Sequence, residues 1–416
     1  MIRFSTTGAL KGMRVLDLGH ALAGPFCAAL LADHGADVIK IEPPIGDDAR
    51  QIGPFAEDDS TREYGSMFQY GNRNKRGMVL DLKVPQGRDA FLKMVESADI
   101  VIENFRAGVM DRLGLGYELL RKRNPRIVYT SIRGFGDPRS GRTKYTDWPT
   151  VDIVAQSMGG LMGITGPDPD SPTYVGSALG DTVPALSAAF ATMVAAWEAR
   201  ASGMGQYVDV GMIDSLIALN QTITTAYSVT GAIPRPAGSR YPQIVPFGRI
   251  AVKDGWAVLA VPPGRNWEMF CETIGRKELI SDPRFSTAEA RVTNTHEVYE
   301  AVEEFTRRHT KSELTEIFGG KVPFAPIFDA GDIFNDPYFK IRQMLQQVEQ
   351  PGSKHLVTVP GVPSKLSRTP SGGCHRAPLL GEHTEQILTD LGFTVDEVAM
   401  LRAAGAITAH SAPFGH

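Results

Sequence analysis

Residues 13–42 read MRVLDLGHALAGPFCAALLADHGADVIKIE, and this stretch decides the fold. Residues 13–19 are a short apolar run, typical of a buried parallel strand. Residues 24–35 carry Phe26, Leu30 and Leu31 at helical spacing, and residues 37–42 form a second apolar run that Pro43-Pro44 ends. The stretch therefore predicts a strand–helix–strand unit.

The same alternation continues along the chain. We expect strands at residues 77–82, 99–104, 127–132 and 207–210, and helices at 85–97, 151–160, 182–200 and 212–220. Strands that alternate with helices predict a doubly wound α/β sheet. Residues 230–246 are rich in Pro, Gly and Arg and read as a linker to a smaller domain. In that domain residues 248–261 predict antiparallel strands around Asp254-Gly255, and residues 323–330 lead back to the large domain.

Composition limits the classes of partner and compartment. The net charge is -4, which disfavours nucleic acid or an anionic membrane surface as the main partner. Cys27, Cys271 and Cys374 are widely spaced and show no metal-binding pattern, so we expect a reducing cytoplasm and no bound metal. The apolar stretches are too interrupted for a membrane span, and residues 1–11 lack a signal-peptide core.

The first strand leads into the helix through Gly19-His20-Ala21-Leu22-Ala23-Gly24-Pro25. Ligands of doubly wound sheets bind at the carboxyl ends of strands, where free helix amides can hold a phosphate or polarise a carbonyl. The dinucleotide pattern GxGxxG is absent, which argues against NAD. The alternative is a plain turn in which His20 is structural.

Two basic segments are candidates for holding phosphates. The first segment precedes a predicted strand and contains Asn72, Arg73, Lys75 and Arg76. The second segment follows a predicted strand and contains Asn104, Phe105, Arg106 and Arg112. Arg and Lys pair strongly with phosphate oxygens. The alternative for each segment is a solvated charged face.

Gly180-Asp181 lies at the start of the predicted long helix. An aspartate there is commonly an N-cap that accepts hydrogen bonds from helix amides. It could also be a carboxylate nucleophile, which the helix dipole would keep ionised. No Ser-His-Asp, GxSxG or HExxH signature competes with this reading.

Together these segments resemble the class III CoA-transferase family, which includes formyl-CoA transferase, carnitine CoA-transferase and α-methylacyl-CoA racemase. The similarity runs in order through nearly the whole chain. Its matching pieces lie at residues 9–25, 35–44, 72–83 (NRNKRGMVLDLK), 98–114 (ADIVIENFRAGVMDRLG), 124–136, 155–166, 180–184 (GDTVP), 203–216 and 379–388.

The resemblance implies a Rossmann-like large domain built from both chain ends (residues 1–228 and 325–416) and a smaller α+β middle domain (residues 229–324). It implies an interlocked homodimer in which each chain threads through its partner. It also implies acyl-CoA and carboxylic acid substrates, with coenzyme A as a co-substrate and no tightly bound cofactor.

The resemblance further implies roles for single residues. Asp181 would attack the acyl-CoA carbonyl and give an anhydride, then an aspartyl-CoA thioester. The acyl group would lie beside His20, Ala21, Leu22 and Ala23. Asn72, Arg73, Lys75, Arg76, Asn104, Phe105, Arg106 and Arg112 would line the CoA site.

The sequence also departs from relatives in the family. Formyl-CoA transferases carry Gln where this chain has Leu22, and a glycine-rich loop where it has residues 240–246, which argues against formyl or oxalate specificity. Two alternatives remain, an acyl-CoA racemase and a noncatalytic CoA-binding protein. Racemases of the family carry a histidine at the position of Val151, and a pure binder would not need Asp181.

Overall fold

The computed structural model describes residues 7–408 apart from 60 and 263, and the chain forms two compact units. The large unit comprises residues up to 161, residues 175–231 and residues from 338 onward. The small unit comprises residues 162–174 and 232–337. Its second segment runs past the expected boundary at 325, because the short strand β9 (Phe324–Pro326) pairs with β8 (Gly255–Ala260) in the small unit.

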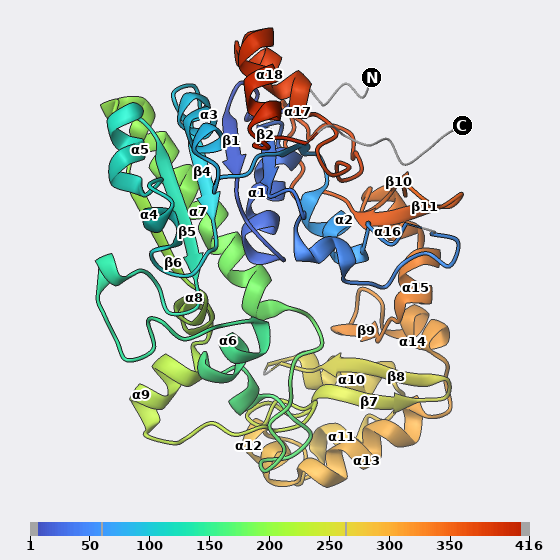
Figure 1. Cartoon of the computed structure of the whole chain (residues 1–416). Coiled ribbons are helices and arrows are strands. Elements are labelled where there is room, and N and C mark those ends of the chain that lie inside the picture. Colours follow the sequence, from blue (N-terminus) through green and yellow to red (C-terminus); the bar gives the residue numbers. More distant parts are fainter. Residues whose placement is uncertain (1–6, 60, 263, 409–416) are drawn as a thin grey trace. The chain divides into compact units, whose positions relative to one another are not determined.

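The large unit is built on a six-stranded parallel sheet in the order β3-β2-β1-β4-β5-β6 (Figure 1). Its strands are β1 (Arg14–Asp17), β2 (Asp37–Glu42), β3 (Arg76–Val79), β4 (Ile100–Glu103), β5 (Val128–Arg133) and β6 (Tyr207–Gly211). The predicted α/β fold with a parallel sheet is thus confirmed. The chain winds outward in both directions from the neighbouring strands β1 and β4, so the loops after these two strands flank a crevice.

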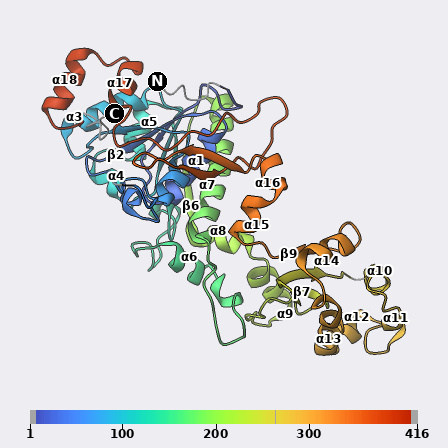
Figure 2. The ribbon, with the colours of Figure 1, turned by 90° about the vertical axis from the view of Figure 1, so that its right-hand side faces the viewer.

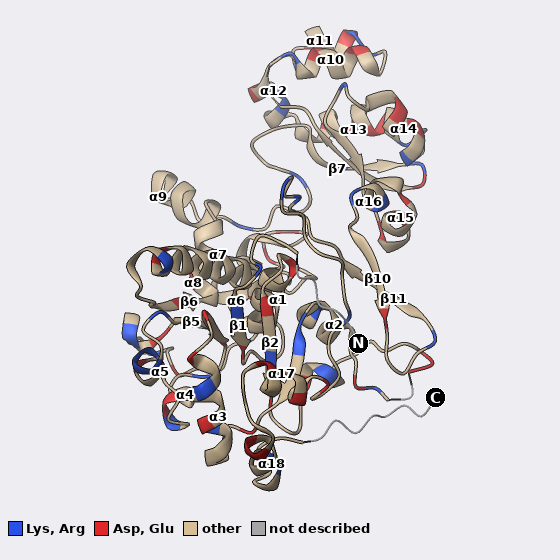
Figure 3. Ribbon diagram, turned by 90° about the horizontal axis from the view of Figure 1, so that it is seen from above, with Lys and Arg blue, Asp and Glu red and all other residues tan. Residues whose placement is uncertain are grey.

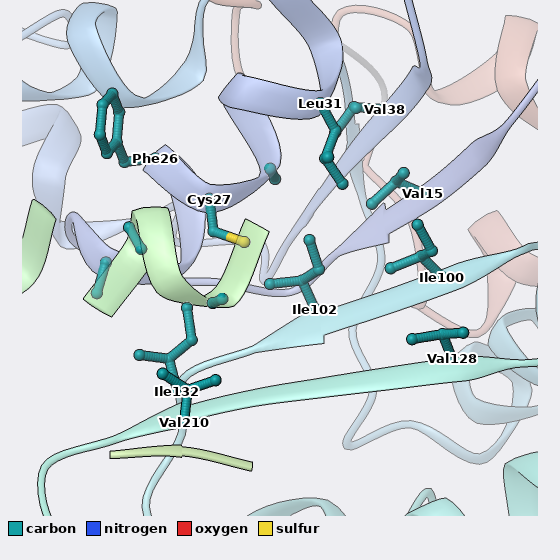
Figure 4. Close-up of a cluster of buried hydrophobic side chains, with 14 of the residues drawn as sticks. Val15, Phe26, Cys27, Leu31, Val38, Ile100, Ile102, Val128, Ile132 and Val210 are labelled. Carbon is teal, nitrogen blue, oxygen red and sulfur yellow. The ribbon is translucent and has the colours of Figure 1, made fainter. Parts of the chain in front are cut away.

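Helices cover both faces of this sheet. The helices before the linker are α1 (Ala23–Asp33), α2 (Ser66–Asn72), α3 (Pro85–Val95), α4 (Val109–Arg112), α5 (Tyr117–Arg123), α6 (Asp152–Met158), α7 (Leu179–Ser202), α8 (Met212–Leu219) and α9 (Tyr227–Thr230), with short turns η1 (Asp48–Gln51), η2 (Pro138–Ser140) and η4 (Thr222–Ala226). One core joins α1, α7 and α8 to strand residues such as Val15, Ile100 and Val128 (Figure 4). The other core joins α3 and α5 to the opposite face.

The chain returns to the large unit at its C-terminal end. The returning elements are α16 (Pro337–Ile341), β10 (Leu345–Glu349), β11 (Leu356–Pro360), α17 (Thr384–Asp390) and α18 (Val395–Ala403). Figures 1 and 2 show α17 and α18 beside α3, and Lys93 of α3 pairs with Glu397 of α18 at 2.8 Å. Residues from both chain ends share one hydrophobic core, in which Leu16 and Phe91 lie with Ile387 and Leu401.

Helix α7 is the longest helix, with 24 residues, and its length and composition would suffice for a membrane span. One face contains Ala185, Ala188, Thr192 and Ala195 and packs on α1, β5 and β6. Small residues allow this close approach of helix and sheet. The opposite face exposes a row of apolar side chains, Leu186, Phe190, Val194 and Trp197.

The small unit combines the antiparallel sheet β7-β8-β9 with helices. Its remaining elements are η3 (Met162–Ile164), β7 (Phe247–Val252), α10 (Asn266–Thr273), α11 (Glu278–Ser281), α12 (Ala288–Thr293), α13 (Thr295–Thr306), α14 (Lys311–Phe318) and α15 (Ala330–Asn335). Trp267, Phe270 and Phe318 form its buried core. Figure 3 shows acidic bands along α14, where Glu313 is exposed while Leu314 is buried.

Candidate active site

A hollow of about 440 Å³ opens at the carboxyl ends of β1, β4 and β5 in the large unit. We call it the Asp181 hollow. It brings together eight of the residues that the sequence predicted, namely Ala21, Leu22, Ala23, Asn104, Phe105, Arg106, Arg112 and Asp181. The segment 146–151 and the strand end 132–135 complete its lining. Its place at the crevice between β1 and β4 is where doubly wound sheets bind ligands.

Hydrogen bonds to residues that follow β4 and β2 hold the loop after β1. The amide of His20 donates to Oδ1 of Asn104 at 2.7 Å, and Nδ2 of Asn104 donates back to the carbonyl of His20 at 2.9 Å. The amide of Ala21, a residue with φ of 56°, donates to Oδ1 of Asp47 at 3.0 Å. This amide is therefore engaged, and the amides of Leu22 and Ala23 at the start of α1 are the candidates for stabilising an oxyanion.

Gly24 allows this loop to approach β4. A side-chain carbon at Gly24 would lie 2.9 Å from the Cα of Gly19 and 3.0 Å from Oδ1 of Asn104. The first contact, with backbone, is closer than real side-chain carbons approach, and the second would require Asn104 to shift. The glycine at position 24 is thus explained by the close approach of the loops that follow β1 and β4.

His20 is not among the residues that line the hollow. Its ring packs against Phe105, with ring centres 5.1 Å apart. Burial, together with the ammonium of Lys40, lowers the pKa of His20 below its usual value. The imidazole is therefore neutral at pH 7 and serves as a support for the loop.

Two buried ion pairs lie under the loop. Nζ of Lys40 contacts Oδ2 of Asp47 at 2.7 Å, and Nζ of Lys75 contacts Oδ2 of Asp17 at 2.7 Å. All four side chains are fully buried. Lys75 also donates to Oδ1 of Asn72 at 2.9 Å, and burial lowers the pKa of Lys75 to about 8. Removing one partner of such a pair leaves an uncompensated buried charge.

The basic segment at 72–76 does not line the Asp181 hollow. Arg73 pairs with Asp33 at 2.5 Å, and Arg76 pairs with Asp37 at 2.8 Å and with Asp390 at 2.7 Å. Together with the buried Asn72 and Lys75, these groups are committed to contacts within the protein. Their positions favour a structural role.

The loop after β4 carries the cations that do line the hollow. Oε2 of Glu103 accepts a hydrogen bond from the amide of Phe105 at 2.6 Å, and Nε of Arg133 donates to the carbonyl of Phe105 at 3.2 Å. Glu103 and Arg133 also pair with each other at 3.1 Å. This buried pair therefore holds the two peptide groups that flank Phe105. Arg106 and Arg112 are exposed and, in the described part of the chain, lie within ion-pair distance of no carboxylate.

Asp181 lies in the first turn of α7, which begins three residues earlier than predicted. Ala178 is the N-cap, so the side chain of Asp181 is not the capping group. Burial, with a smaller contribution from the carboxylate of Asp152, raises the pKa of Asp181 to about 7. Burial thus acts in the opposite direction to the helix dipole, which was expected to keep this group ionised.

Asp152 and Gln156 hold the segment that leads to Asp181. Oδ1 of Asp152 accepts from the amide of Gly180 at 2.7 Å and from Nε2 of Gln156 at 2.9 Å. Gln156 is fully buried, donates to the carbonyl of Ser177 at 3.1 Å and accepts from the amide of Val175. A side chain at Gly180 would meet the carbonyl of Asp152 at 2.4 Å.

Sequence reasoning missed these supporting groups, although a signal was present. Lys40 and Glu42 interrupt the apolar run DVIKIE, and Glu103 ends IVIE. A charged residue inside a strand that is covered on both faces must find a partner. Such residues mark a buried polar network, but the sequence does not tell which partner each will find.

No metal centre accompanies the carboxylates. Within residues 7–408, apart from the two positions left undescribed, no group of three or more His, Cys, Asp and Glu side chains could hold a metal ion.

Comparison with known proteins finds relatives of this chain among the CoA-transferases. The sequence model of CoA-transferase family III matches residues 10–384. The chain is 41% identical over 385 residues to a succinyl-CoA:mesaconate CoA-transferase of Haloarcula hispanica, covering 92% of this chain and 97% of that protein. It is 35% identical over 390 residues to a succinate–glutarate CoA-transferase of Agrobacterium fabrum, covering 92% and 95% of the two chains.

A solved structure shares the architecture. The crystal structure of a CaiB/BaiF family protein from Brucella suis superposes with a TM-score of 0.81 at 34% sequence identity. The superposition covers 92% of this chain and all of that one.

Proposed function

The chain belongs to CoA-transferase family III, and from that premise we propose that it moves CoA from succinyl-CoA to a small dicarboxylic acid through a covalent intermediate on Asp181. Three of the similar proteins are named for succinyl-CoA with mesaconate, for succinyl-CoA with D-citramalate and for succinate with glutarate, while others are named for formyl-CoA or acetyl-CoA with oxalate. All of these acids are short dicarboxylates. The racemase and the noncatalytic binder, considered from sequence, are not favoured by these names.

The position of Asp181 carries the covalent proposal. Its carboxylate lines the same hollow as the N-terminus of α1 and the arginines after β4. A carboxylate with a pKa of about 7 is poorly solvated, and is thus a better nucleophile than an exposed aspartate, yet half of it is ionised at neutral pH.

The reaction then proceeds in balanced steps. A carboxylate oxygen of Asp181 attacks the thioester carbonyl, the C–S bond breaks, and CoA thiolate leaves an acyl–aspartyl anhydride. The thiolate attacks the aspartyl carbonyl and releases succinate, which gives an aspartyl-CoA thioester. The acceptor carboxylate attacks this thioester, the C–S bond breaks, and CoA thiolate leaves a second anhydride. The thiolate then attacks the acceptor's acyl carbon, the C–O bond to Asp181 breaks, and the Asp181 carboxylate is freed.

The residues around the hollow suit a CoA thioester. We assign Arg106 and Arg112 to the phosphates of CoA, because charge-assisted pairing with phosphate favours unpaired guanidinium groups. Trp148 and Val151 are exposed apolar residues of the lining and would contact the pantetheine arm. The amides of Leu22 and Ala23 would hold the oxyanion of each tetrahedral intermediate.

A second hollow suits the acid. It measures about 450 Å³, and we call it the hydroxyl hollow because Ser66, Tyr70 and Thr182 line it. It shares Leu22 with the Asp181 hollow, and Thr182 follows Asp181 directly. We propose that the acyl group and the acceptor acid occupy this space in turn.

A homodimer completes the proposal. The exposed side chains Leu186, Phe190, Val194 and Trp197 form one apolar row on α7, which we call the α7 row. A contiguous apolar surface of this kind marks a protein interface. We propose that a second copy of this chain covers it, and that the enzyme works in the cytoplasm, where the free thiols of Cys27, Cys271 and Cys374 remain reduced.

Replacement of Asp181 tests the covalent role. We expect Asp181→Ala to lower succinyl-CoA:dicarboxylate transfer by about 10⁴-fold or more while CoA binding measured by calorimetry is retained. Incubation of the unaltered enzyme with succinyl-CoA should add a hydroxylamine-sensitive mass to the peptide that contains Asp181.

The matched control is Asp214→Ala, an exposed aspartate on the neighbouring helix α8 that does not line the hollow. It should transfer CoA at the normal rate. Near-normal turnover by Asp181→Ala would overturn the assignment.

A further inference from the structure

Three arginines converge on a separate polar hollow that lies wholly within the small unit. Its volume is about 600 Å³, and we call it the arginine hollow. Arg240 precedes β7, Arg249 lies in β7 and Arg307 directly follows α13, so distant parts of the chain supply the three guanidinium groups. The arginine hollow shares no residue with the Asp181 hollow or with the hydroxyl hollow.

Aromatic rings hold two of these arginines in place. The guanidinium carbon of Arg249 lies 4.2 Å from the ring centre of Trp256, which also lines the hollow. That of Arg240 lies 3.6 Å from the ring centre of Tyr299. A guanidinium group stacked on a ring loses less conformational freedom when it binds an anion, because its plane is already fixed.

The charges in the hollow are not balanced. Glu303 contacts both Arg240 at 3.3 Å and Arg307 at 2.6 Å. It is the single carboxylate in the described lining, and in the described chain no carboxylate lies within ion-pair distance of Arg249. Three positive groups around one negative group repel each other, so an anion that enters the hollow relieves this repulsion.

The backbone keeps the hollow open beside these cations. The amide of Gly238, a residue with φ of 68°, donates to the carbonyl of Gly166 at 2.9 Å and joins the two loops that form one wall. Ser239 adds a hydroxyl group to the same wall. The hollow therefore combines fixed cations, a polar wall and a volume typical of small-ligand sites.

We propose that the arginine hollow binds a small dianion through carboxylate or phosphate oxygens, with Arg249 as the principal contact. The planar fork of Arg249 matches both oxyanions in a two-point contact. Arg240 and Arg307 supply the remaining positive charge, and both contact Glu303. This binding goes beyond the transfer reaction and does not depend on it.

The test is an anion titration of the whole protein. Succinate, inorganic phosphate and acetate are added at constant ionic strength set with chloride, and Trp256 fluorescence and heat are recorded. We expect a saturable signal with succinate or phosphate and none with acetate. Arg249→Gln should weaken this binding by about tenfold or more, the loss expected for one charge-assisted contact.

Matched variants localise the signal. Arg308→Gln removes the next arginine along the chain, which pairs with Glu304 and does not line the hollow, so its binding should equal that of the unaltered protein. Trp256→Phe should lose the fluorescence change but keep the heat. Arg249→Lys, which keeps the charge without the planar fork, should bind with intermediate strength and serves if Arg249→Gln does not fold.

The relative strength of the two dianions distinguishes a dicarboxylate site from a phosphate site, and either result supports the proposal. A signal that does not saturate, that chloride alone reproduces, or that is unchanged in both Arg249 variants would overturn it.

Discussion

At the scale of single residues, Asp181 and Asp152 form a pair of carboxylates whose charges interact. Burial and the charge of Asp152 raise the pKa of Asp181 to about 7. Only the ionised form is a nucleophile, so kcat/KM for the donor should fall as the pH drops below about 7. Asp152→Asn removes the nearby negative charge and lowers the pKa of Asp181, so the acid side of the pH profile should move to lower pH.

Asparagine is the informative replacement because its Oδ1 can still accept the hydrogen bond from Gly180. The change therefore alters charge more than geometry. Asp214→Asn, outside the hollow, should leave the profile where it is. An acid limb that stays in place in a correctly folded Asp152→Asn protein would contradict the electrostatic coupling.

Val151 separates transfer from racemisation. A racemase removes an α-proton on one face of the thioester and returns one on the other, so it needs two placed acid–base groups. Val151 lines the Asp181 hollow at the position where the racemases carry histidine, and His20 does not line the hollow. In deuterated water we expect no exchange at the α-carbon of a 2-methylacyl-CoA, measured by NMR at enzyme concentrations that give rapid CoA transfer. Deuterium uptake that depends on Asp181 would reverse the assignment.

The sequence predicted which residues belong to the candidate site better than it predicted the contacts around those residues. The loops 19–25 and 104–106 could be selected from sequence, because glycine, amide and basic residues follow predicted strand ends, and Asp181 could be selected through the family resemblance. The surroundings could not. Lys75 belongs to a basic patch in the sequence, yet in the fold it is a buried partner of Asp17. Charge pairing between residues 58 positions apart depends on how strands and loops meet, which local sequence does not encode.

At the scale of elements, the loop after β4 depends on the Glu103–Arg133 pair. Glu103 accepts from the amide of Phe105 and Arg133 donates to its carbonyl, so the pair holds the peptide groups on both sides of Phe105, next to Arg106. Weakening these hydrogen bonds should disorder the proposed phosphate-binding arginines without changing the surroundings of Asp181. We therefore expect Glu103→Gln and Arg133→Lys to raise the donor KM by about three- to tenfold with little change in kcat, in the same direction as Arg106→Ala.

Steady-state kinetics with varied succinyl-CoA measures this effect. Arg123→Lys, an exposed arginine of α5 that pairs with Glu96, is the matched control and should be silent. A loss confined to kcat, with unchanged KM, would show that the pair acts on the chemical step instead of on the loop.

Element boundaries show where sequence reasoning succeeds and where it stops. The strand β2 was predicted at its observed limits because Pro43-Pro44 follows it. Helix α7 begins at Leu179 and not at residue 182. The prediction used Pro184 as a marker of the helix start, whereas Pro184 lies inside the helix, so the predicted start was too late. Strand β9 has three residues and forms only by pairing with β8, so nothing within its own sequence defines it.

At the scale of the whole molecule, the α7 row is the surface on which assembly should depend. Phe190 is 74% and Trp197 is 76% exposed, which is unusual for such large apolar side chains on a helix whose other face is buried. If a second chain covers the row, sedimentation should show a dimer at the lowest measurable concentration. The midpoint of thermal unfolding should also rise with protein concentration, because folding and association are then one equilibrium.

The double variant Phe190→Glu with Trp197→Glu places charge in this surface and should lower the unfolding midpoint by several degrees and produce monomer or aggregate. Val395→Glu is the matched control, since Val395 is 86% exposed on α18, away from the row. A charge there should leave assembly and midpoint unchanged.

A folded, active monomer of the unaltered chain would refute the homodimer, because chains threaded through one another cannot separate without unfolding. A dimer unaffected by the α7 substitutions would move the interface to another surface.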